Sequence, residues 1–218
     1  MDISPIPTYI VNIPTQVERK ENILKQFNNK PQFDINFIDA ELDPIGAVGL
    51  WKSIVKTIRI AQEQNHDKIL FCEDDHFFTS TYTFDFLLKN LKIANEKGAD
   101  LLIGGVSGFG STIPVDKNLY LVDWYWGNQF LIIDKCLFQP IIDYKFENTN
   151  NADGVLSSIA KTKLIIYPFI SAQKEFGYSN IEPKNAQKGF VNNLFVKAIE
   201  RFNGIHKLNL LYNYENKK

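Results

Sequence analysis

Three consecutive carboxylates, EDD at 73–75, directly follow the apolar run ILFC at 69–72. Neighbouring acids repel one another and unpaired buried charge is costly, so such a cluster belongs on a solvated turn or beside a cation. Carboxylate oxygens together with substrate phosphates are the ligands that Mg²⁺ and Mn²⁺ prefer. The cluster therefore predicts either a divalent-metal site or a solvated surface turn, and the surrounding elements must decide between them.

The rest of the chain alternates between strand-like apolar runs and segments with helical periodicity. Strands are expected at 8–13, 33–38, 68–72, 100–103, 120–122, 129–133 and 163–167. Helices are expected after Thr15, at 47–65, at 84–97, briefly after Asp134, and from 151 or 153 to 160. Thr15 and Glu18 have the spacing of a capping box. This alternation predicts an α/β fold with a mostly parallel sheet flanked by helices.

In open α/β sheets, ligands bind beyond the carboxyl ends of the strands, and the EDD cluster lies at such an end. This position suggests a metal site, and the alternative, in which one acid caps the next element and the others are solvated, stays open. His76 follows the acids directly and is a weaker ligand candidate, because its side chain can point elsewhere.

Composition excludes several classes of protein. The net charge of −1 argues against a nucleic-acid partner, which normally requires a basic excess. Cys72 and Cys136 form no disulfide framework and are expected to be reduced. The N-terminus has no basic segment followed by an apolar core, and no apolar run approaches the roughly 20 residues of a membrane span. A cytoplasmic protein is the simplest expectation.

The order of short motifs along residues 8–181 resembles the bacterial lipooligosaccharide-type glycosyltransferases of family 25, whose relatives include the collagen galactosyltransferases. The matching pieces are YIVNI at 9–13 with Arg19, Asp39-Ala40, GLWKSI at 49–54, ILFCEDD at 69–75, GNQF at 127–130, Asp153, Pro168 with Gln173, and SNI at 179–181. Two positions depart from the family pattern. Leu50 and Ile54 stand where the family has cysteine and histidine, and the second arginine near Arg19 is absent.

This resemblance implies a GT-A, Rossmann-like fold and a metal-dependent transferase. The enzyme would move a hexose such as galactose, with inversion, from a nucleotide-diphosphate sugar, expected to be a UDP-sugar, to a glycan or lipid-linked saccharide. Asp75 and Glu73 would hold Mn²⁺ or Mg²⁺, with Glu73 also near the ribose and Asp74 orienting the cluster from behind. The implied donor-binding residues are Val11, Asn12, Arg19, Asp39, Ser53, Glu73 and Asp74.

An inverting transferase needs a general base for the acceptor hydroxyl. Asp153, in NADG at a predicted helix start, is the first candidate, although Asp is also among the best N-caps. Asp123, in VDWYWG, is the second candidate. Its neighbours Trp124 and Trp126 belong to an aromatic cluster that either stacks on an acceptor sugar or packs in the core.

Two other functional classes remain open. The missing family histidine at Ile54 is compatible with a non-catalytic relative that binds a nucleotide-sugar or a glycan. A metal-dependent phosphohydrolase could use the same acids, but such enzymes usually add further histidines for a two-metal site, and this chain has only three.

Residues 184–218 differ in character from residues 1–183, which would form the catalytic domain. They hold seven Lys and Arg against two acids, and an apolar stripe marks a helix of about three turns: Val191, Leu194, Phe195, Ala198, Ile199 and Phe202. A basic amphipathic helix predicts peripheral contact with the inner face of a membrane. The alternative is a C-terminal helix docked on the core, with a frayed tail.

Overall fold

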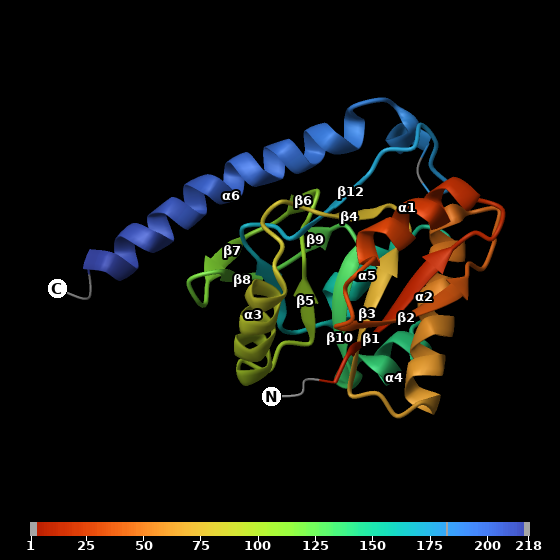
Figure 1. Ribbon diagram of the computed structural model, residues 1–218, viewed down its shortest axis with the longest axis horizontal. Coiled ribbons are helices and arrows are strands. Elements are labelled where there is room, and N and C mark those ends of the chain that lie inside the picture. The colour runs from red at the N-terminus through yellow and green to blue at the C-terminus, as the bar shows by residue number, and fades with distance from the viewer. Residues whose placement is uncertain (1–3, 182, 216–218) are drawn as a thin grey trace.

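In the computed structural model, residues 4–181 and 183–215 are described, and within them eight strands form one sheet in the order β2-β1-β3-β10-β5-β11-β8-β7 (Figure 1). Six of these strands run in one direction, whereas β10 and β8 run in the other. The predicted α/β fold with a mostly parallel sheet is therefore confirmed. The strands are β1 (Ile6–Asn12), β2 (Phe33–Asp39), β3 (Lys68–Glu73), β5 (Leu101–Ile103), β7 (Thr112–Pro114), β8 (Leu119–Val122), β10 (Phe130–Asp134) and β11 (Lys163–Ile166).

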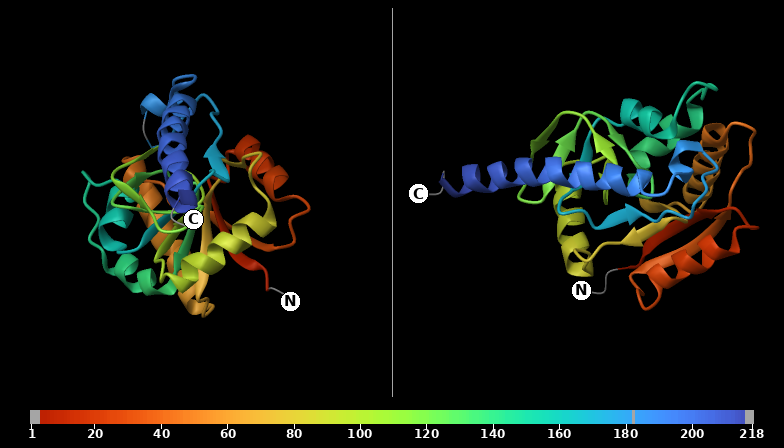
Figure 2. Two further views of the ribbon diagram at one scale, coloured as in Figure 1. Left: turned by 90° about the vertical axis from the view of Figure 1, so that its left-hand side faces the viewer. Right: turned by 90° about the horizontal axis from the view of Figure 1, so that it is seen from above.

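Helices cover both faces of this sheet (Figure 2). One core layer contains apolar side chains of α1 and α3, and the other contains those of α2, α4, α5 and α6. Alternate residues of β1 enter opposite layers, Ile10 the first and Tyr9 the second, as the two-residue period of a strand requires. The helices are α1 (Val17–Phe27), α2 (Gly46–Glu63), α3 (Phe84–Glu96), α4 (Phe138–Asp143), α5 (Ala152–Ile159) and α6 (Phe190–Glu215), with 3₁₀ turns η1 (Lys135–Leu137) and η2 (Pro183–Ala186).

Two small antiparallel sheets were missed by the sequence analysis. One pairs β4 (His76–Phe78) with β12 (Ser171–Gln173), and the other pairs β6 (Gly108–Phe109) with β9 (Tyr125–Trp126). Both β6 and β7 lie within residues 104–114, where the sequence analysis expects neither a strand nor a helix. Strands of two or three residues are too short to show a period in the sequence, and long-range pairing creates them.

Helix caps give a mixed outcome. Thr83 caps α3 by accepting from the amide of Phe86, and Asp134 caps η1. The predicted Thr15–Glu18 capping box is wrong, because α1 begins after Gln16, whose side chain makes no cap hydrogen bond. At α5 the cap is Asn151, which accepts from the amide of Gly154 at 2.7 Å.

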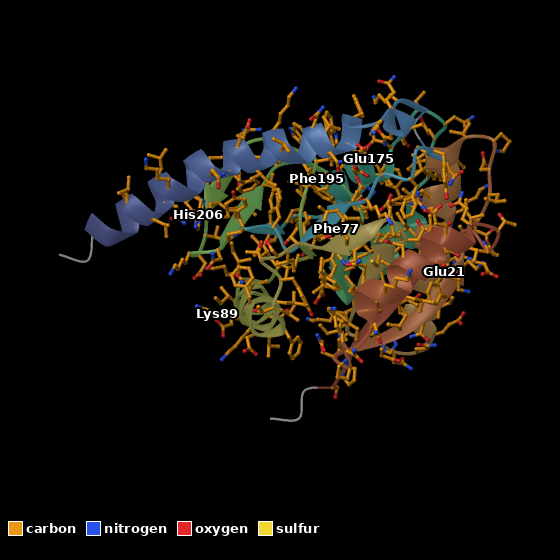
Figure 3. The ribbon with its side chains drawn as sticks, turned by 45° about the horizontal axis from the view of Figure 1, so that its top comes forward. Glu21, Phe77, Lys89, Glu175, Phe195 and His206 are labelled. Atoms are coloured by element: carbon orange, nitrogen blue, oxygen red, sulfur yellow. The ribbon has the colours of Figure 1, made fainter. Side chains whose placement is uncertain are left out.

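The C-terminal helix α6 has 26 residues, far more than the three turns expected, and packs across the sheet domain. Phe202 is fully buried and stacks on Tyr167 with ring centroids 4.8 Å apart. Arg201 donates to the carbonyl oxygens of Phe109 and Gly110 at 2.5 and 2.6 Å. Figure 3 shows Phe195 and His206 on the side of α6 that faces the body. Four residues of the stripe assigned to lipid thus pack in the core, as the docked alternative predicted, namely Val191, Phe195, Ala198 and Phe202, whereas Ile199 is exposed.

No helix within residues 4–181 and 183–215 combines the length and apolar character that a membrane crossing requires. Both cysteines are free thiols, and Cys72 is buried whereas Cys136 is exposed.

Candidate functional site

The carboxyl ends of neighbouring strands bring the acids together with residues from distant parts of the chain. Val11 at the end of β1 pairs with Glu73 at the end of β3, and Asn12 pairs with Asp39 of β2. The antiparallel strand β10 lies on the other side of β3, with Phe130 opposite Cys72. The residues that precede β10, Gly127 and Asn128, therefore arrive at the same edge of the sheet.

Asp74 is held by two partners. It accepts from Asn12 Nδ2 at 2.7 Å and from Arg19 Nε at 2.6 Å, and Arg19 also donates to Asp75 at 3.0 Å. The guanidinium lies over the ring of Phe176, with 4.9 Å from Cζ to the centroid. The nearby carboxylates outweigh burial and raise the pKa of Arg19, so it stays charged. Asp74 is therefore an internal counter-ion of Arg19.

Glu73 and Asp75 are less satisfied. Among the residues that the structure describes, the Glu73 carboxylate has no hydrogen-bond partner and Asp75 Oδ1 is buried without one. Burial, strengthened by the charges of Asp75 and Asp153, raises the pKa of Glu73 well above its usual value. Burial also raises the pKa of Asp75 to about 6, although Arg19 opposes this shift. Two carboxylates in this state are poised to gain from a cation.

The residues present fit a divalent cation that arrives with its substrate. Three carboxylates and one guanidinium leave a formal charge of −2 when all are ionised, and Asp75 Oδ1 and Glu73 supply free oxygens. Within residues 4–181 and 183–215 there is no group of three or more His, Cys, Asp and Glu side chains arranged to hold a metal alone. Mg²⁺ commonly takes one or two carboxylates plus phosphate oxygens, which matches this set.

His76 does not belong to the acid cluster. Its Nδ1 lies 2.8 Å from Ser171 Oγ, and its ring packs among Phe27, Phe78 and Phe130. Burial lowers the pKa of His76 to about 3, so the ring is neutral. The weaker ligand candidate of the sequence analysis is a core residue.

A cavity of about 330 Å³ opens beside the acids, between β1, the segment 40–43 and the start of α2. It is lined by most of the residues that the resemblance assigned to donor binding, namely Val11, Asn12, Arg19, Ser53, Glu73 and Asp74. Ser53 acts through the backbone, because its hydroxyl accepts from the amide of Glu41 and donates to the carbonyl of Gly49, both at 2.8 Å. Asp39 is the exception: it is exposed, lies outside the lining, and its carbonyl oxygen accepts from Lys56.

A second cavity, of about 340 Å³, lies on the other side of Glu73. Its lining includes Trp126, Asn128 and Asp153 together with Phe190 and Leu194 from α6. Asp153 accepts from the amide of Gly127 at 2.8 Å and, through its other oxygen, from Asn128 Nδ2. Burial raises the pKa of Asp153. Since Asn151 caps α5, the carboxylate of Asp153 faces this cavity region and is not used as the cap.

The aromatic pair of the sequence analysis is divided by this geometry. Trp124 and Trp126 have ring centroids 5.0 Å apart, but only Trp126 lines the second cavity. Trp126 lies directly over Gly108, where a Cβ would be 2.6 Å from the indole ring. Asp123 is exposed and accepts from the amide of Trp124 at 2.7 Å, away from the residues that line the two cavities. The second base candidate is therefore not placed beside Glu73.

Residues 174–181 and 183–189 contribute to the lining of the site and were not recognised from the sequence, apart from the Ser179-Asn180-Ile181 match. Ile181 and Glu73 line both cavities and a smaller hollow beside Asp75. Glu175 fastens the segment to the start of α6 by accepting from the amides of Gly189 and Asn192 at 2.7 and 3.0 Å. Residues without periodicity gave no local signal for this position.

Comparison with known proteins gives a fold and no family. No family model matches the chain, and no curated protein matches it. Among solved structures, A197 from STIV has a TM-score of 0.52 at 13% identity, covering 78% of this chain and 85% of its own. A UDP-glucose pyrophosphorylase without ligand has a TM-score of 0.50 at 11% identity, covering 88% and 82%.

The same enzyme type in complex with UDP-glucose has a TM-score of 0.50 at 13% identity, covering 88% of this chain and 81% of the other. Identities this low show a shared fold and nothing finer. The chain has the mixed α/β fold of GT-A-like and sugar-nucleotidyltransferase structures, a fold that nucleotide-sugar enzymes use.

Proposed function

We propose that this protein is a metal-dependent glycosyltransferase that moves a hexose from a nucleoside-diphosphate sugar to a saccharide acceptor. One observation carries the proposal: Glu73 lines both cavities, so the acid cluster stands where a donor on one side meets an acceptor on the other. A transferase needs both substrates on either side of the bond that breaks. A simple binding module would need only one of them.

The first cavity suits the nucleoside diphosphate. Departure of the diphosphate places negative charge on its oxygens, and a divalent cation held by Asp75 and Glu73 would neutralise that charge as a Lewis acid. Arg19 holds the side chains of Asp74 and Asp75 in place through hydrogen bonds, and its guanidinium adds a permanent positive charge to this end of the cavity. Asn12 and the backbone of segment 40–42 offer hydrogen-bonding groups to the nucleoside.

The second cavity suits the acceptor. Asp153 keeps lone pairs beyond the two hydrogen bonds that orient it, and its raised pKa brings a carboxylate closer to the range of an effective general base. It would take the proton from the attacking hydroxyl, as inversion requires. Trp126 offers an indole face to the acceptor ring, because nearly half of its surface is exposed.

The finer assignment, to family 25 of the glycosyltransferases, is part of the same proposal. Its support is convergence: three matching pieces, namely Asn12 with Arg19, the EDD cluster and Asp153, meet around the two cavities. Ile54, which replaces the family histidine, is fully buried with Trp51 in the core. A residue that packs here leaves the cavity wall intact, which favours an active enzyme over a non-catalytic relative.

We also propose that α6 contacts the anionic inner face of a membrane. The original apolar stripe is docked, but Leu208 and Leu211 are 67% and 50% exposed near the far end of the helix, which extends beyond the sheet (Figure 1). Lys197 and Lys207 lie on the same helix, and the sequence ends in two lysines. Replacing Leu208 and Leu211 by serine should reduce co-sedimentation with phosphatidylserine vesicles at unchanged melting temperature.

The deciding experiment supplies a panel of nucleotide sugars with Mn²⁺ and measures nucleotide release with and without saccharide acceptors. Acceptor-dependent release with a glycosylated product supports the transferase. Release without any acceptor dependence would identify a hydrolase. Formation of a nucleotide sugar from a nucleoside triphosphate and a sugar 1-phosphate, with pyrophosphate released, would identify a nucleotidyltransferase. Donor binding without turnover of any kind would identify a binding module.

A further inference from the structure

Two tryptophans lie on the outward face of the small sheet β6–β9. Trp124 and Trp126 are 38% and 48% exposed, and their ring centroids are 5.0 Å apart. Tyr125, between them, is fully buried, as the alternation of side chains along a strand requires. Indole rings are among the largest apolar groups in proteins, so two exposed neighbours form a patch that requires an explanation. We call Trp124 and Trp126 the indole platform.

Two glycines lie beneath the indole platform. Gly108 pairs with Trp126 across the sheet, and the amide of Gly110 donates to the carbonyl of Trp124 at 3.0 Å. A Cβ on Gly108 would be 2.6 Å from the ring of Trp126, and a Cβ on Gly110 would overlap Nε1 of Trp124. Each indole therefore packs closely against a glycine, and the exposed part of its surface is directed away from the sheet.

Hydrogen bonds hold the platform in a fixed position. The amide of Ser107 donates to the carbonyl of Trp126 at 2.9 Å, and the carboxylate of Asp123 accepts from the amide of Trp124 at 2.7 Å. From α6, which passes over β6 in Figure 1, Arg201 donates to two backbone carbonyls at the end of β6. A surface that is already rigid loses little conformational entropy when it binds a ligand.

The platform continues the wall of the second cavity. Trp126 lines this cavity together with Asp153, whereas Trp124 lies outside the lining. Because the two indoles are neighbours, Trp124 extends the wall outward from the cavity. A sugar chain whose last ring packs on Trp126 can therefore place its preceding ring on Trp124.

The charges around the platform have both signs. Glu73 and Asp153 are acids of the second cavity, Lys184 is a base in the same lining, and Asp123 lies beside Trp124. This mixture does not select a strongly anionic or cationic ligand, whereas a ligand with many hydroxyl groups can hydrogen-bond to groups of either sign. A pyranose ring combines such hydroxyls with an apolar C–H face that can pack on an indole.

We infer that Trp126 and Trp124 form two consecutive sugar-ring subsites, so that the acceptor is an oligosaccharide of at least two rings. The terminal ring, which receives the hexose, packs on Trp126 beside Asp153. The preceding ring packs on Trp124. This inference rests on the proposed function, which it deepens by naming the class of acceptor.

Saccharides of different length test the two subsites. The probes are methyl glucoside and methyl galactoside, with cellobiose, maltose, lactose and galactobiose as disaccharides, all in the presence of UDP and Mn²⁺. Tryptophan fluorescence and calorimetry measure binding. We expect at least one disaccharide to bind more tightly than the methyl glycoside of its terminal sugar. Trp124→Ala should remove this gain, roughly threefold to tenfold for one aromatic contact, and leave the affinity for the methyl glycoside unchanged.

Further variants separate sugar binding from structural cover of Gly110. Trp124→Phe should keep most of the gain, because a phenyl ring also offers a flat apolar face. Trp124→Leu should lose it although it still covers the glycine, and it replaces the alanine variant if that variant does not fold by circular dichroism. Ile113→Ala is the matched control, because it removes a side chain that is 59% exposed and outside both cavity linings. It should change neither affinity.

Each other result has a defined meaning. Length-dependent binding in a protein that transfers no sugar would keep the subsites and overturn the proposed function. Transfer to a methyl glycoside and to its disaccharide with equal KM, unchanged by Trp124→Ala, would keep the transferase and overturn the subsites. A wild type that binds none of the saccharides would also overturn them. So would a dimer that dissociates in the Trp124 variants in sedimentation experiments, because a second copy of the chain would then cover the indoles.

Discussion

At the residue scale, adjacent acids have different roles because their neighbours differ. Asp74 is committed to Arg19 and Asn12, Asp75 shares Arg19 but keeps one free oxygen, and Glu73 has no hydrogen-bond partner among the described residues. Removing one partner of a buried ion pair leaves the other charge uncompensated, whereas removing an unpaired carboxylate relieves repulsion. The same substitution should therefore have opposite consequences at neighbouring positions.

We expect Asp75→Asn to abolish transfer and the Mn²⁺-dependent affinity for UDP. Without metal it should change the free energy of unfolding by less than Asp74→Asn does, because the loss of its ion pair with Arg19 is offset by the removal of a buried carboxylate charge. Asp74→Asn should instead lower that free energy by about 3 kcal/mol, because Arg19 loses its main buried partner. Urea titration and calorimetry with UDP and Mn²⁺ measure both. Wild-type turnover in the Asp75 variant would disprove the metal assignment.

Asp153→Asn should leave UDP affinity nearly unchanged and slow transfer by a factor on the order of 10² to 10⁴, the usual contribution of a general base. The side-chain amide introduced at position 153 can keep a hydrogen bond to Asn128 if the Asn128 amide group flips, so the orientation of the introduced side chain is preserved. Steady-state kinetics with saturating donor give the rate. Asp123→Asn is the control, and an equal loss there would move the base assignment to the exposed hairpin.

His76 gives the protein an acid-sensitive core. Its pKa is lowered to about 3 by burial, against about 6.5 in an unfolded chain. Between these values the unfolded chain binds a proton that the folded chain does not, so this contribution to stability is complete above pH 6.5 and declines as the pH falls toward 3. We expect His76→Gln to remove about 2 kcal/mol of the stability difference between about pH 7.5 and about pH 5. Urea titrations at both pH values test this, and an unchanged difference would contradict it.

At the element scale, the start of α2 and the segment 174–189 depend on one glycine. A Cβ on Gly46 would overlap the carbonyl oxygen of Asn180, so any larger residue must displace the chain next to Ile181, which lines both cavities. Gly204, inside α6, has open space around the corresponding position. The two glycines therefore provide a test and its control. Gly46 is required because another segment approaches it closely, whereas Gly204 only lowers the stability of its helix through the low helix propensity of glycine.

Gly46→Ala should weaken UDP binding by roughly tenfold, since a displacement of about 1 Å near a site has effects of this size or larger. Circular dichroism should show that its helices are retained. Gly204→Ala should leave UDP affinity unchanged and raise the free energy of unfolding by up to about 1 kcal/mol, the helix advantage of alanine. Unchanged UDP affinity in the Gly46 variant would contradict the proposal that the first cavity, which residues 180 and 181 help to line, binds the donor.

At the scale of the whole molecule, α6 completes the core and forms part of the lining of the second cavity. Phe195 and Phe202 pack on the sheet domain, whereas Phe190 and Leu194 reach the second cavity. A single helix thus contributes both to stability and to the candidate site. Loss of this helix would expose apolar core and open the cavity at the same time.

Phe202→Ala should lower the free energy of unfolding by about 3 to 5 kcal/mol, because it removes a fully buried ring stacked on Tyr167. Leu208→Ala, on the same helix but largely exposed, should change it by no more than about 0.5 kcal/mol. Deletion of 191–218 should cause aggregation or early melting. Thermal melts of the three proteins are the measurement, and equal stability of both point variants would contradict the docked helix.

The sequence by itself determined the elements with a clear period and the place of the acids among them. The β3 strand, the amphipathic helix α2 and the EDD cluster at a strand end follow from local patterns, because burial on one face fixes the spacing of apolar residues. The α/β fold then follows from the alternation of these elements. Local chemistry also marked Asp153 and Trp126, although their roles remained open.

Only the tertiary structure decided which of these residues meet. The antiparallel strand β10 pairs with β3 and so brings Asn128 to the same end of the sheet as Glu73. Arg19 binds Asp74, although the two residues are 55 positions apart in the sequence. The same packing leaves Asp123 and Asp39 exposed and outside the lining of the two cavities. It also places Phe195 and Phe202 of α6 in the core. Such pairings depend on how apolar surfaces far apart in the sequence pack against one another. A local sequence pattern shows that one face of an element is buried, but it does not show which other element buries it.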